Sequence, residues 1–141
     1  MATLDKLFAG VLRAKGFRAT PGRMRLLELL EKADEPLSIR DILKRAKSDL
    51  LDQVTLYRAL ESFSKSGIVR RVDLNNGIAR YEYGLGKHHD HLVCTGCGAV
   101  EDVEKCAVSN LEASVVKSSR RFTSIYSHNL EFFGSCKSCS K

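Results

Sequence analysis

The sequence predicts an α+β protein built from two modules, and three features of the 141-residue chain lead to this prediction. The first part shows helical spacing of apolar residues, followed by two short β-branched runs. Charge is uneven, because residues 1–87 contain 17 Lys and Arg against 11 Asp and Glu, whereas residues 88–141 contain 6 of each. All four histidines and all five cysteines lie in the second part. We expect one domain in residues 1–83, a junction in 84–87 and a second domain in 88–141.

Composition excludes several classes of protein. The chain is 43% hydrophobic and 28% charged, as in ordinary soluble globular proteins. No stretch approaches the ~18 uninterrupted apolar residues of a membrane span. The N-terminal residues lack the apolar core of a secretory signal. We therefore expect a cytoplasmic protein without a membrane partner.

Two helices are predicted before residue 32. Apolar residues recur with helical spacing in the first, and Gly16 is placed to end it. Thr20 is a good N-cap for the second helix, and Pro21 suits its first turn. The apolar positions that define the two helices are Leu4, Leu7, Phe8, Val11 and Leu12, then Met24, Leu27 and Leu30.

Two further helices are predicted between residues 38 and 67. Ser38 and Asp41 resemble a capping box, with Asp in place of Glu. Asp52 is placed to cap the fourth helix, and Gly67 to end it in the left-handed conformation. The expected buried faces are Ile42, Leu43 and Ala46, then Val54, Tyr57, Leu60 and Phe63.

Two strands follow, at residues 68–73 and 78–83, around a turn containing Asn76-Gly77. Short helices followed by a hairpin predict a winged helix-turn-helix, whose last helix enters the DNA major groove. Arg can pair with guanine, Gln with adenine, and Thr with the thymine methyl group. The candidate DNA contacts near the start of the fourth helix are Gln53, Thr55, Tyr57 and Arg58. The alternative is that Tyr57 is partly core and Arg58 a surface charge.

Four cysteines form two C-x-x-C pairs, Cys94/Cys97 and Cys136/Cys139, separated by 38 residues. Each pair alone resembles a redox motif, but two such pairs, the first with neighbouring glycines, favour a structural Zn²⁺ with four thiolate ligands. Such a site has no open position for chemistry. The fifth cysteine, Cys106, is interpreted as a small core residue.

A run of three histidines and an aspartate precedes the first C-x-x-C pair. If residues 88–91 are extended, His88 and Asp90 face one way and His89 and His91 the other. One segment then feeds two metal sites, whose imidazole and carboxylate donors select Fe²⁺, Mn²⁺, Co²⁺, Ni²⁺ or Zn²⁺. The candidates to complete the first site are Glu112 and His128, and those for the second are Glu82 and Asp102.

At this point the chain resembles the ferric uptake regulator family of bacterial metal-dependent repressors. The resemblance covers nearly the whole chain in the family's order. It is carried by HHDHLVCTGCG at residues 88–98, GFRATPGR at 16–23, VTLYRAL at 54–60, Ser127-His128 and the closing Cys136-x-x-Cys139.

The resemblance implies an N-terminal winged helix-turn-helix DNA-binding domain, a hinge, and a C-terminal α/β dimerisation domain with structural zinc. It implies a homodimeric repressor, not an enzyme, that binds inverted-repeat operators in double-stranded DNA when loaded with Fe²⁺, Mn²⁺ or Zn²⁺. The resemblance implies control of metal homeostasis, with iron as the first expectation. No small organic substrate is implied.

The resemblance also assigns roles to individual residues. It matches the four paired cysteines to structural zinc, and Arg18 to a minor-groove contact. Tyr57 and Arg58 match major-groove contacts. The two regulatory sites are matched to His88, Asp90, Glu112 and His128 in the dimerisation domain, and to Glu82, His89, His91 and Asp102 at the hinge.

The chain departs from the family at three places. Members usually supply a hinge-site histidine near the start of the third helix, where this chain has Asp34-Glu35-Pro36. Two alternatives follow: the hinge site has one ligand fewer, or one of the carboxylates of Asp34 and Glu35 takes the place of the histidine. Asp102 stands where iron sensors often have Glu. In the family, an Asp at this place is associated with peroxide sensing. An insertion around residues 105–107 affects the match of Glu112.

Three alternatives remain open at this stage. One is a peroxide-sensing Fe/Mn-dependent repressor of the same family. Another is a metalloenzyme, although no H-E-x-x-H motif is present. The last is a zinc-ribbon interaction protein, which the neutral charge of residues 88–141 disfavours as a nucleic-acid binder.

Overall fold

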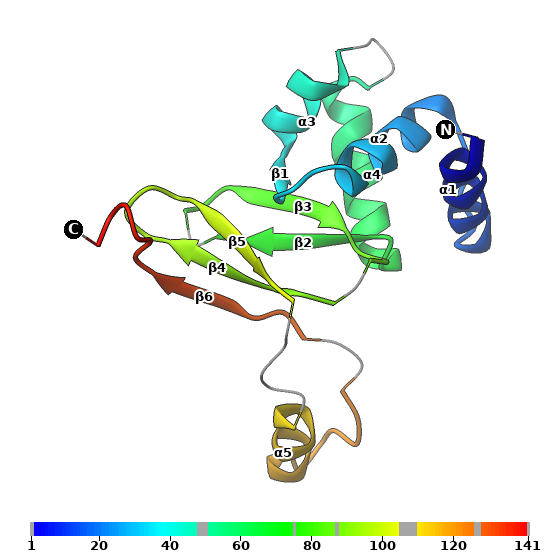
Figure 1. Ribbon diagram of the computed structural model, residues 1–141. Helices are drawn as coiled ribbons and strands as arrows, with labels where there is room; N and C mark the ends of the chain where they lie inside the picture. The colour runs from blue at the N-terminus through cyan, green and yellow to red at the C-terminus, as the bar shows by residue number, and fades with distance from the viewer. Residues whose placement is uncertain are drawn as a thin grey trace. The chain divides into compact units, whose positions relative to one another are not determined.

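A computed structural model describes residues 2–47, 51–74, 76–86, 88–104, 110–125 and 128–140. The chain divides into two compact units, Met1–Gly86 and Lys87–Lys141 (Figure 1). Three parts of the sequence interpretation lie outside the described residues: Cys106 with the insertion around it, Lys87 of the junction, and Ser127. No helix in the described part of the chain is long and apolar enough to cross a membrane.

The first unit is a winged helix, as predicted. Its elements are α1 (Ala2–Ala14), α2 (Pro21–Glu31), β1 (Leu37–Ser38), α3 (Ile39–Ala46), α4 (Gln53–Ser66), β2 (Val69–Asp73) and β3 (Ala79–Tyr83). The central strand β3 pairs antiparallel with both β1 and β2 (Figure 1). The two-residue strand β1 was not expected, because two residues carry no periodicity.

The core of the first unit is formed mainly by its helices. In α2, Leu26, Leu27 and Leu30 are buried, whereas Met24 packs only partly against them. The predicted apolar face of α4 is wrong at its start, since Val54 and Tyr57 are 60% and 56% exposed. The predicted positions are three residues apart, which is less than one turn of an α-helix. Each successive position is therefore rotated around the helix axis, and the four do not lie on one face. The face that α4 buries is Leu56, Ala59, Leu60 and Phe63.

Capping residues fix where the helices begin and end. Ser38 and Asp41 form the predicted capping box, in which each side chain accepts the other residue's backbone N–H. The Asp52 carboxylate accepts the N–H groups of Val54 and Thr55, both at 3.0 Å. Gly67 ends α4 with φ of +79°, a conformation that favours glycine.

In its described residues, the second unit has a three-stranded sheet and the helix α5. Its elements are β4 (Asp90–Cys94), β5 (Val100–Val103), α5 (Leu111–Ser118) and β6 (Glu131–Gly134). The central strand β4 pairs antiparallel with β5 and parallel with β6. Among the described residues of this unit the only buried apolar side chains are Val93 and Cys94, and α5 buries none. A core this small needs metal ligation or association for stability.

Candidate metal centres and DNA-contacting surface

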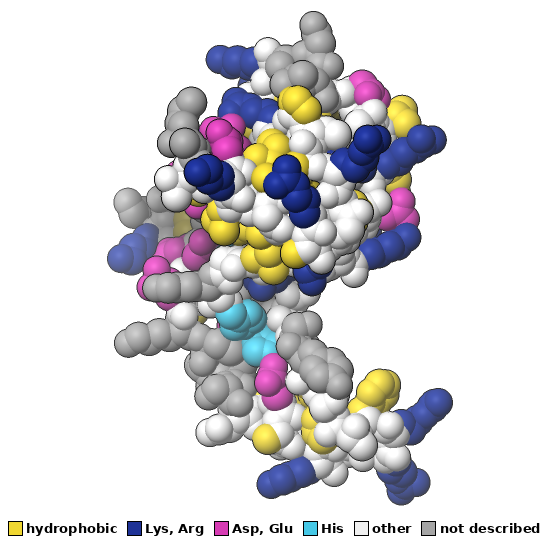
Figure 2. All heavy atoms as spheres, turned by 90° about the vertical axis from the view of Figure 1, so that its right-hand side faces the viewer, with side chains coloured by type: hydrophobic (Ala, Val, Ile, Leu, Met, Phe, Trp, Pro, Cys, Tyr) yellow, Lys and Arg dark blue, Asp and Glu magenta, His cyan; other side chains and the backbone are white. Residues whose placement is uncertain are grey.

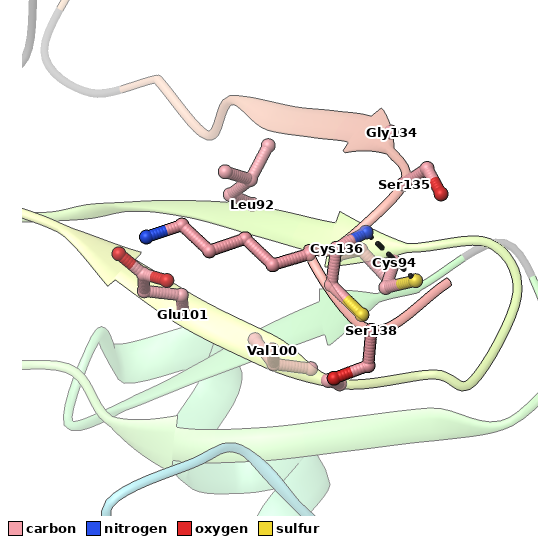
Figure 3. A pocket seen from close by; sticks show the side chains of 11 residues that line it. Leu92, Cys94, Val100, Glu101, Gly134, Ser135, Cys136 and Ser138 are labelled. Carbon is pink, nitrogen blue, oxygen red and sulfur yellow. Dashed lines mark hydrogen bonds between the residues drawn. The ribbon is translucent and has the colours of Figure 1, made fainter. Parts of the chain in front are cut away.

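The four paired cysteines converge in the second unit. Their Sγ atoms lie within 4.8 Å of one another, and the Cys97 and Cys136 sulfurs are 3.7 Å apart. The backbone N–H of Cys136 donates to the Cys94 sulfur at 3.3 Å (Figure 3). The Thr95 N–H and hydroxyl both donate to Gly134 O, which ties the two pairs together. Four convergent thiols form a donor set suited to Zn²⁺.

Proton affinities in the cluster also suit a cation. Backbone N–H groups, chiefly that of Cys136, lower the pKa of Cys94 to about 6. Hydrogen bonds to the neighbouring thiols, first that of Cys136, raise the pKa of Cys139 to about 12. The Cys94 thiolate therefore forms readily, whereas the Cys139 thiol keeps its proton because it hydrogen-bonds to the neighbouring sulfurs.

Gly96 lies close against the cysteine cluster. A Cβ at this position would lie 3.0 Å from Cys139 Sγ. An open pocket of about 490 Å³ adjoins the cluster and includes Cys94 and Cys136 (Figure 3). Leu92 and Val100 contribute apolar side chains to the lining of this pocket.

His88, Asp90 and His128 form a second group of donors. The Nε2 atoms of the two histidines are 3.0 Å apart, and Asp90 Oδ1 lies 3.5 Å from His88 Nε2 and 4.0 Å from His128 Nε2. The Asp90 side chain is 1% exposed, and its Oδ1 makes no hydrogen bond to any described residue. A buried oxygen without a hydrogen bond is costly, and a cation among these three donors would satisfy it.

Glu112, expected as a ligand of this site, lies on the first turn of α5. Its Oε1 is 2.6 Å from Nδ1 of His128, the ring nitrogen that does not face His88. Glu112 is therefore absent from the set of convergent donor atoms among the described residues, which comprises only His88, Asp90 and His128.

His89, His91 and Asp102 gather on the other face of the 88–91 segment. The Asp102 carboxylate lies 3.7 Å from Nε2 of His91 and 4.0 Å from Nε2 of His89. Pairing of β4 with β5 explains this, because His91 and Asp102 are direct cross-strand neighbours. The two histidine rings are 5.0 Å apart. Two imidazoles and a carboxylate are a donor set for a divalent transition metal.

Glu82, the remaining expected hinge ligand, lies on β3 of the first unit and is buried. Its Oε1 accepts a hydrogen bond of 3.0 Å from Nη1 of Arg70, its cross-strand partner on β2. The sequence interpretation missed Arg70, since only strand register brings the two residues together.

Asp34 and Glu35, considered as substitutes for a histidine ligand, belong to no metal-capable group among the described residues. Glu35 instead lies 3.8 Å from Arg45. Nearby, Arg80 donates to the carbonyl of Pro36 at 3.3 Å. The region where the family places a histidine is thus occupied by arginine contacts.

The candidate DNA contacts lie on the solvent side of the first unit. Gln53, Thr55, Tyr57 and Arg58 are all exposed on the first turns of α4, and Arg18 is exposed before α2. The Thr55 hydroxyl donates to Asp52, so its methyl group is the part that remains for apolar contact. Lys and Arg side chains are spread over the face of this unit seen in Figure 2.

A basic winged helix joined to a unit with clustered cysteine and histidine donors defines a class of protein, the metal-binding DNA-binding regulators. The family model described as "Ferric uptake regulator family" matches residues 14–133. The chain belongs to this family and is a metal-responsive transcriptional regulator, not an enzyme. Regulators of this family bind DNA and function as dimers.

Individual relatives agree with this assignment. A ferric uptake regulation protein of Neisseria gonorrhoeae is 32% identical over 131 residues, covering 91% of this chain and 90% of its own. The ferric uptake regulator of Francisella tularensis, solved with iron, is 32% identical with a TM-score of 0.70, covering 89% of this chain and 96% of that one. The regulator of Pseudomonas aeruginosa, solved with manganese, is 27% identical with a TM-score of 0.75, covering 93% and 98%.

Proposed function

We propose that this regulator is a homodimeric repressor of metal-homeostasis genes that binds inverted-repeat operators when a divalent cation, Fe²⁺ first, is bound. The observation that carries the proposal is the arrangement of residues 88–91, which presents donors to two separate clusters on opposite faces. Oxygen and imidazole donors suit Fe²⁺ and Mn²⁺. The relatives solved with iron and with manganese support both ions.

Two clusters have different roles in this proposal. The Cys94, Cys97, Cys136 and Cys139 site holds Zn²⁺ permanently and stabilises the small second unit. The cluster of His88, Asp90 and His128, with Glu112 beside it, holds a further divalent ion. Its buried, unsatisfied Asp90 oxygen supports a bound cation.

The regulatory step is assigned to Glu82, His89, His91 and Asp102. A cation bound by Glu82 of the first unit and by the histidines of the second restricts the orientations that the two units sample. In a dimer this restriction sets the separation of the two α4 helices to match half-sites about one helical turn apart. Metal and DNA must then strengthen each other's binding by the same factor.

The second unit supports self-association. Its described surface exposes large apolar side chains, and β5 and β6 form the edges of its sheet. Large exposed apolar side chains are frequent at interaction surfaces. The side chains that we assign to the dimer interface are Leu92, Leu111, Val115, Phe122, Phe132 and Phe133.

The proposal is tested by operator binding of protein that was treated with a chelator but retains its cysteine zinc. Fe²⁺, Mn²⁺ and Zn²⁺ are added anaerobically to separate samples, followed by peroxide. Binding that requires metal and survives peroxide supports the metal-homeostasis repressor. Loss of binding with peroxide in the Fe²⁺ sample alone identifies a peroxide sensor. Binding indifferent to all three ions contradicts metal control.

The hinge role is tested by Glu82→Ala. We expect weaker metal-dependent operator binding with the cysteine zinc retained. Glu61→Ala is the matched control, because Glu61 is an exposed carboxylate of the same unit that pairs with Lys65 at 3.0 Å. Operator affinity of Glu82→Ala equal to that of the control, with metal present, contradicts hinge coupling.

The DNA-contacting residues are tested by Tyr57→Ala and Arg58→Ala. Both side chains are exposed, so neither change is expected to affect thermal stability. We expect each to weaken operator binding by about 1–3 kcal/mol if it contacts a base. Gln53→Ala, Thr55→Ala and Arg18→Ala extend the same test. Unchanged affinity in all five variants would assign DNA contact to another surface.

A further inference from the structure

We propose that Arg23 is a positioning residue for DNA binding, because its guanidinium holds the loop of residues 17–20 in the conformation that presents Arg18 to the minor groove. The inference rests on the proposed function, in which Arg18 and the start of α4 contact the operator. In this role Arg23 acts through Arg18 and makes no phosphate contact of its own.

The backbone carbonyl of Arg18 is held by two donors. It accepts the backbone N–H of Thr20 at 3.0 Å and Nη1 of Arg23, also at 3.0 Å. The hydrogen bond from the guanidinium is charge-assisted, which makes it stronger than one between neutral groups. Two donors occupy both lone pairs of the carbonyl oxygen. The Arg18 side chain is exposed, so the loop is fixed through its backbone and leaves this side chain available for DNA.

The guanidinium of Arg23 also lies over the ring of Phe17, with Cζ 5.6 Å from the ring centroid. This distance is within the range of a cation–π contact. Phe17 in turn packs edge-on against Phe63, and their ring centroids are 5.1 Å apart. Phe63 is fully buried on α4. The side chain that holds Arg18 therefore also connects the loop to the helix expected in the major groove.

The ends of the loop are held by the backbone and do not depend on Arg23. Phe17 N–H donates to the carbonyl of Leu12 at 2.8 Å, and Met24 N–H donates to the carbonyl of Thr20 at 2.9 Å. The Arg18 carbonyl lies between these two hydrogen bonds. Loss of the guanidinium should therefore loosen the middle of the loop without unfolding α1 or α2.

The alternative role is a direct contact between Arg23 and a DNA phosphate, since a guanidinium has five N–H donors. The Arg23 side chain is only partly exposed and lies against Phe17, which favours the positioning role. The two roles differ in mutational coupling. A positioning residue has an effect only while Arg18 is present, whereas the effects of two independent phosphate contacts add.

The test is a double-mutant cycle in the full-length protein, with its cysteine zinc in place and Mn²⁺ added. The probe is the labelled duplex that wild type selects from a random DNA pool, and fluorescence anisotropy measures its affinity. The single variants are Arg23→Met, which removes the donors and keeps an unbranched side chain, Arg23→Lys, which keeps the charge, and Arg18→Ala. The double variant combines Arg18→Ala with Arg23→Met. Arg25→Met is the control, because Arg25 lies on the same helix, pairs with Glu28 at 2.8 Å, and its substitution removes the same charge.

We expect Arg23→Met to weaken operator binding about 5–30-fold, the cost of fixing the backbone of one freed residue when DNA binds. Arg23→Lys should recover part of this loss, because lysine can still donate to the carbonyl but has no planar group to cover the Phe17 ring. In the Arg18→Ala background, Arg23→Met should change affinity by less than about twofold. Its effect on the salt dependence of binding should also be absent there.

A loss of equal size in both backgrounds overturns the inference. So does a salt slope that falls by about 0.9 when Arg23 is replaced in the Arg18→Ala protein, because one phosphate contact changes the slope by this amount. An Arg18→Ala variant with wild-type affinity overturns the inference while the proposed repressor function stands. Wild type that selects no duplex from the pool overturns the proposed function, and the inference with it.

A second readout needs no DNA. The carbonyl of Arg18 and the N–H of Ala19 belong to one peptide plane, so ¹⁵N relaxation of the Ala19 amide reports on the held carbonyl. Its order parameter should be about 0.85 in wild type and below about 0.6 in Arg23→Met. Amides of α1 and α2 should keep their wild-type values, which separates local loosening from loss of folding. Equal order parameters at Ala19 in the two proteins overturn the positioning role.

Discussion

Arg70 and Glu82 form an ion pair across strands β2 and β3, with Nη1 of the guanidinium 3.0 Å from Oε1 of the carboxylate. The two side chains are 20% and 9% exposed, so the pair is more shielded from water than a surface salt bridge. Glu82 is also the residue that we assign to the regulatory cation. A cation that binds Glu82 would therefore share the negative charge of this carboxylate with Arg70 and be repelled by the guanidinium.

We predict that Arg70→Gln lowers the Mn²⁺ concentration needed for half-maximal operator binding. An ion pair of ~1 kcal/mol corresponds to about a fivefold change. Arg71→Gln is the control, because Arg71 is exposed on the same strand and its substitution removes the same charge. The measurement is fluorescence anisotropy of labelled operator DNA during a Mn²⁺ titration. An unchanged or higher Mn²⁺ requirement relative to Arg71→Gln would show that Arg70 does not compete with the cation.

Removal of one thiol should abolish the structural zinc site. We predict that Cys136→Ser loses zinc and destabilises the second unit and the dimer, because few apolar side chains are buried there. Zinc content and sedimentation velocity measure both effects. Ser138→Ala, within the same C-x-x-C turn, is the control. A Cys136→Ser protein that is folded, dimeric and zinc-free would refute the structural role.

Zinc affinity of the cysteine site should rise with pH. The pKa of Cys139, raised to about 12 by the neighbouring thiols, means that zinc displaces a proton from this residue at neutral pH. Cys94 has a pKa of about 6, so this second ligand becomes mostly protonated below pH 6. Its protonation weakens zinc binding further in that pH range. Competition with a chelator at several pH values, with proton release followed by an indicator dye, tests this. A pH-independent zinc affinity would contradict it.

Acid should weaken the capping box that starts α3. Hydrogen bonding to the Ser38 side chain is the main cause that lowers the pKa of Asp41 below its ordinary value of 3.8. Because this pKa is lower in the folded state, the stabilisation is present above pH 3.8 and is lost as the pH falls through the lower folded value. Ser38→Ala should cost about 1 kcal/mol at neutral pH. Denaturant melts from pH 7 to 2 should show a smaller acid-dependent loss in Ser38→Ala than in wild type.

The packing of Gly84 leaves no room for a side chain. A Cβ there would lie 2.9 Å from the carbonyl oxygen of Gly67 and 3.2 Å from the backbone nitrogen of Arg70. Both are backbone atoms, which cannot shift without a cost in stability. We predict that Gly84→Ala destabilises the first unit by about 1–3 kcal/mol. Gly86→Ala is the control, since its nearest contact, Tyr83 O, would be at 4.0 Å. Equal melting temperatures for the two variants would contradict the prediction.

Local signals in the sequence were sufficient for much of the fold. The caps at Ser38 and Asp52, the end of α4 at Gly67 and the hairpin that follows depend on residues close to one another in the chain. The same holds for the two C-x-x-C pairs, because the spacing within each pair allows its two sulfurs to bind one metal ion. Strand alternation was enough to predict that residues 88–91 serve two clusters.

Contacts between distant residues required the tertiary structure. Helical periodicity did not reveal which side of α4 faces water at Val54 and Tyr57, because the apolar pattern there fits two faces. Cross-strand register brings Arg70 to Glu82, and the position of α5 brings Glu112 to Nδ1 of His128. A sequence records which donors exist, whereas the direction of each donor atom depends on packing between elements that are separate in the chain.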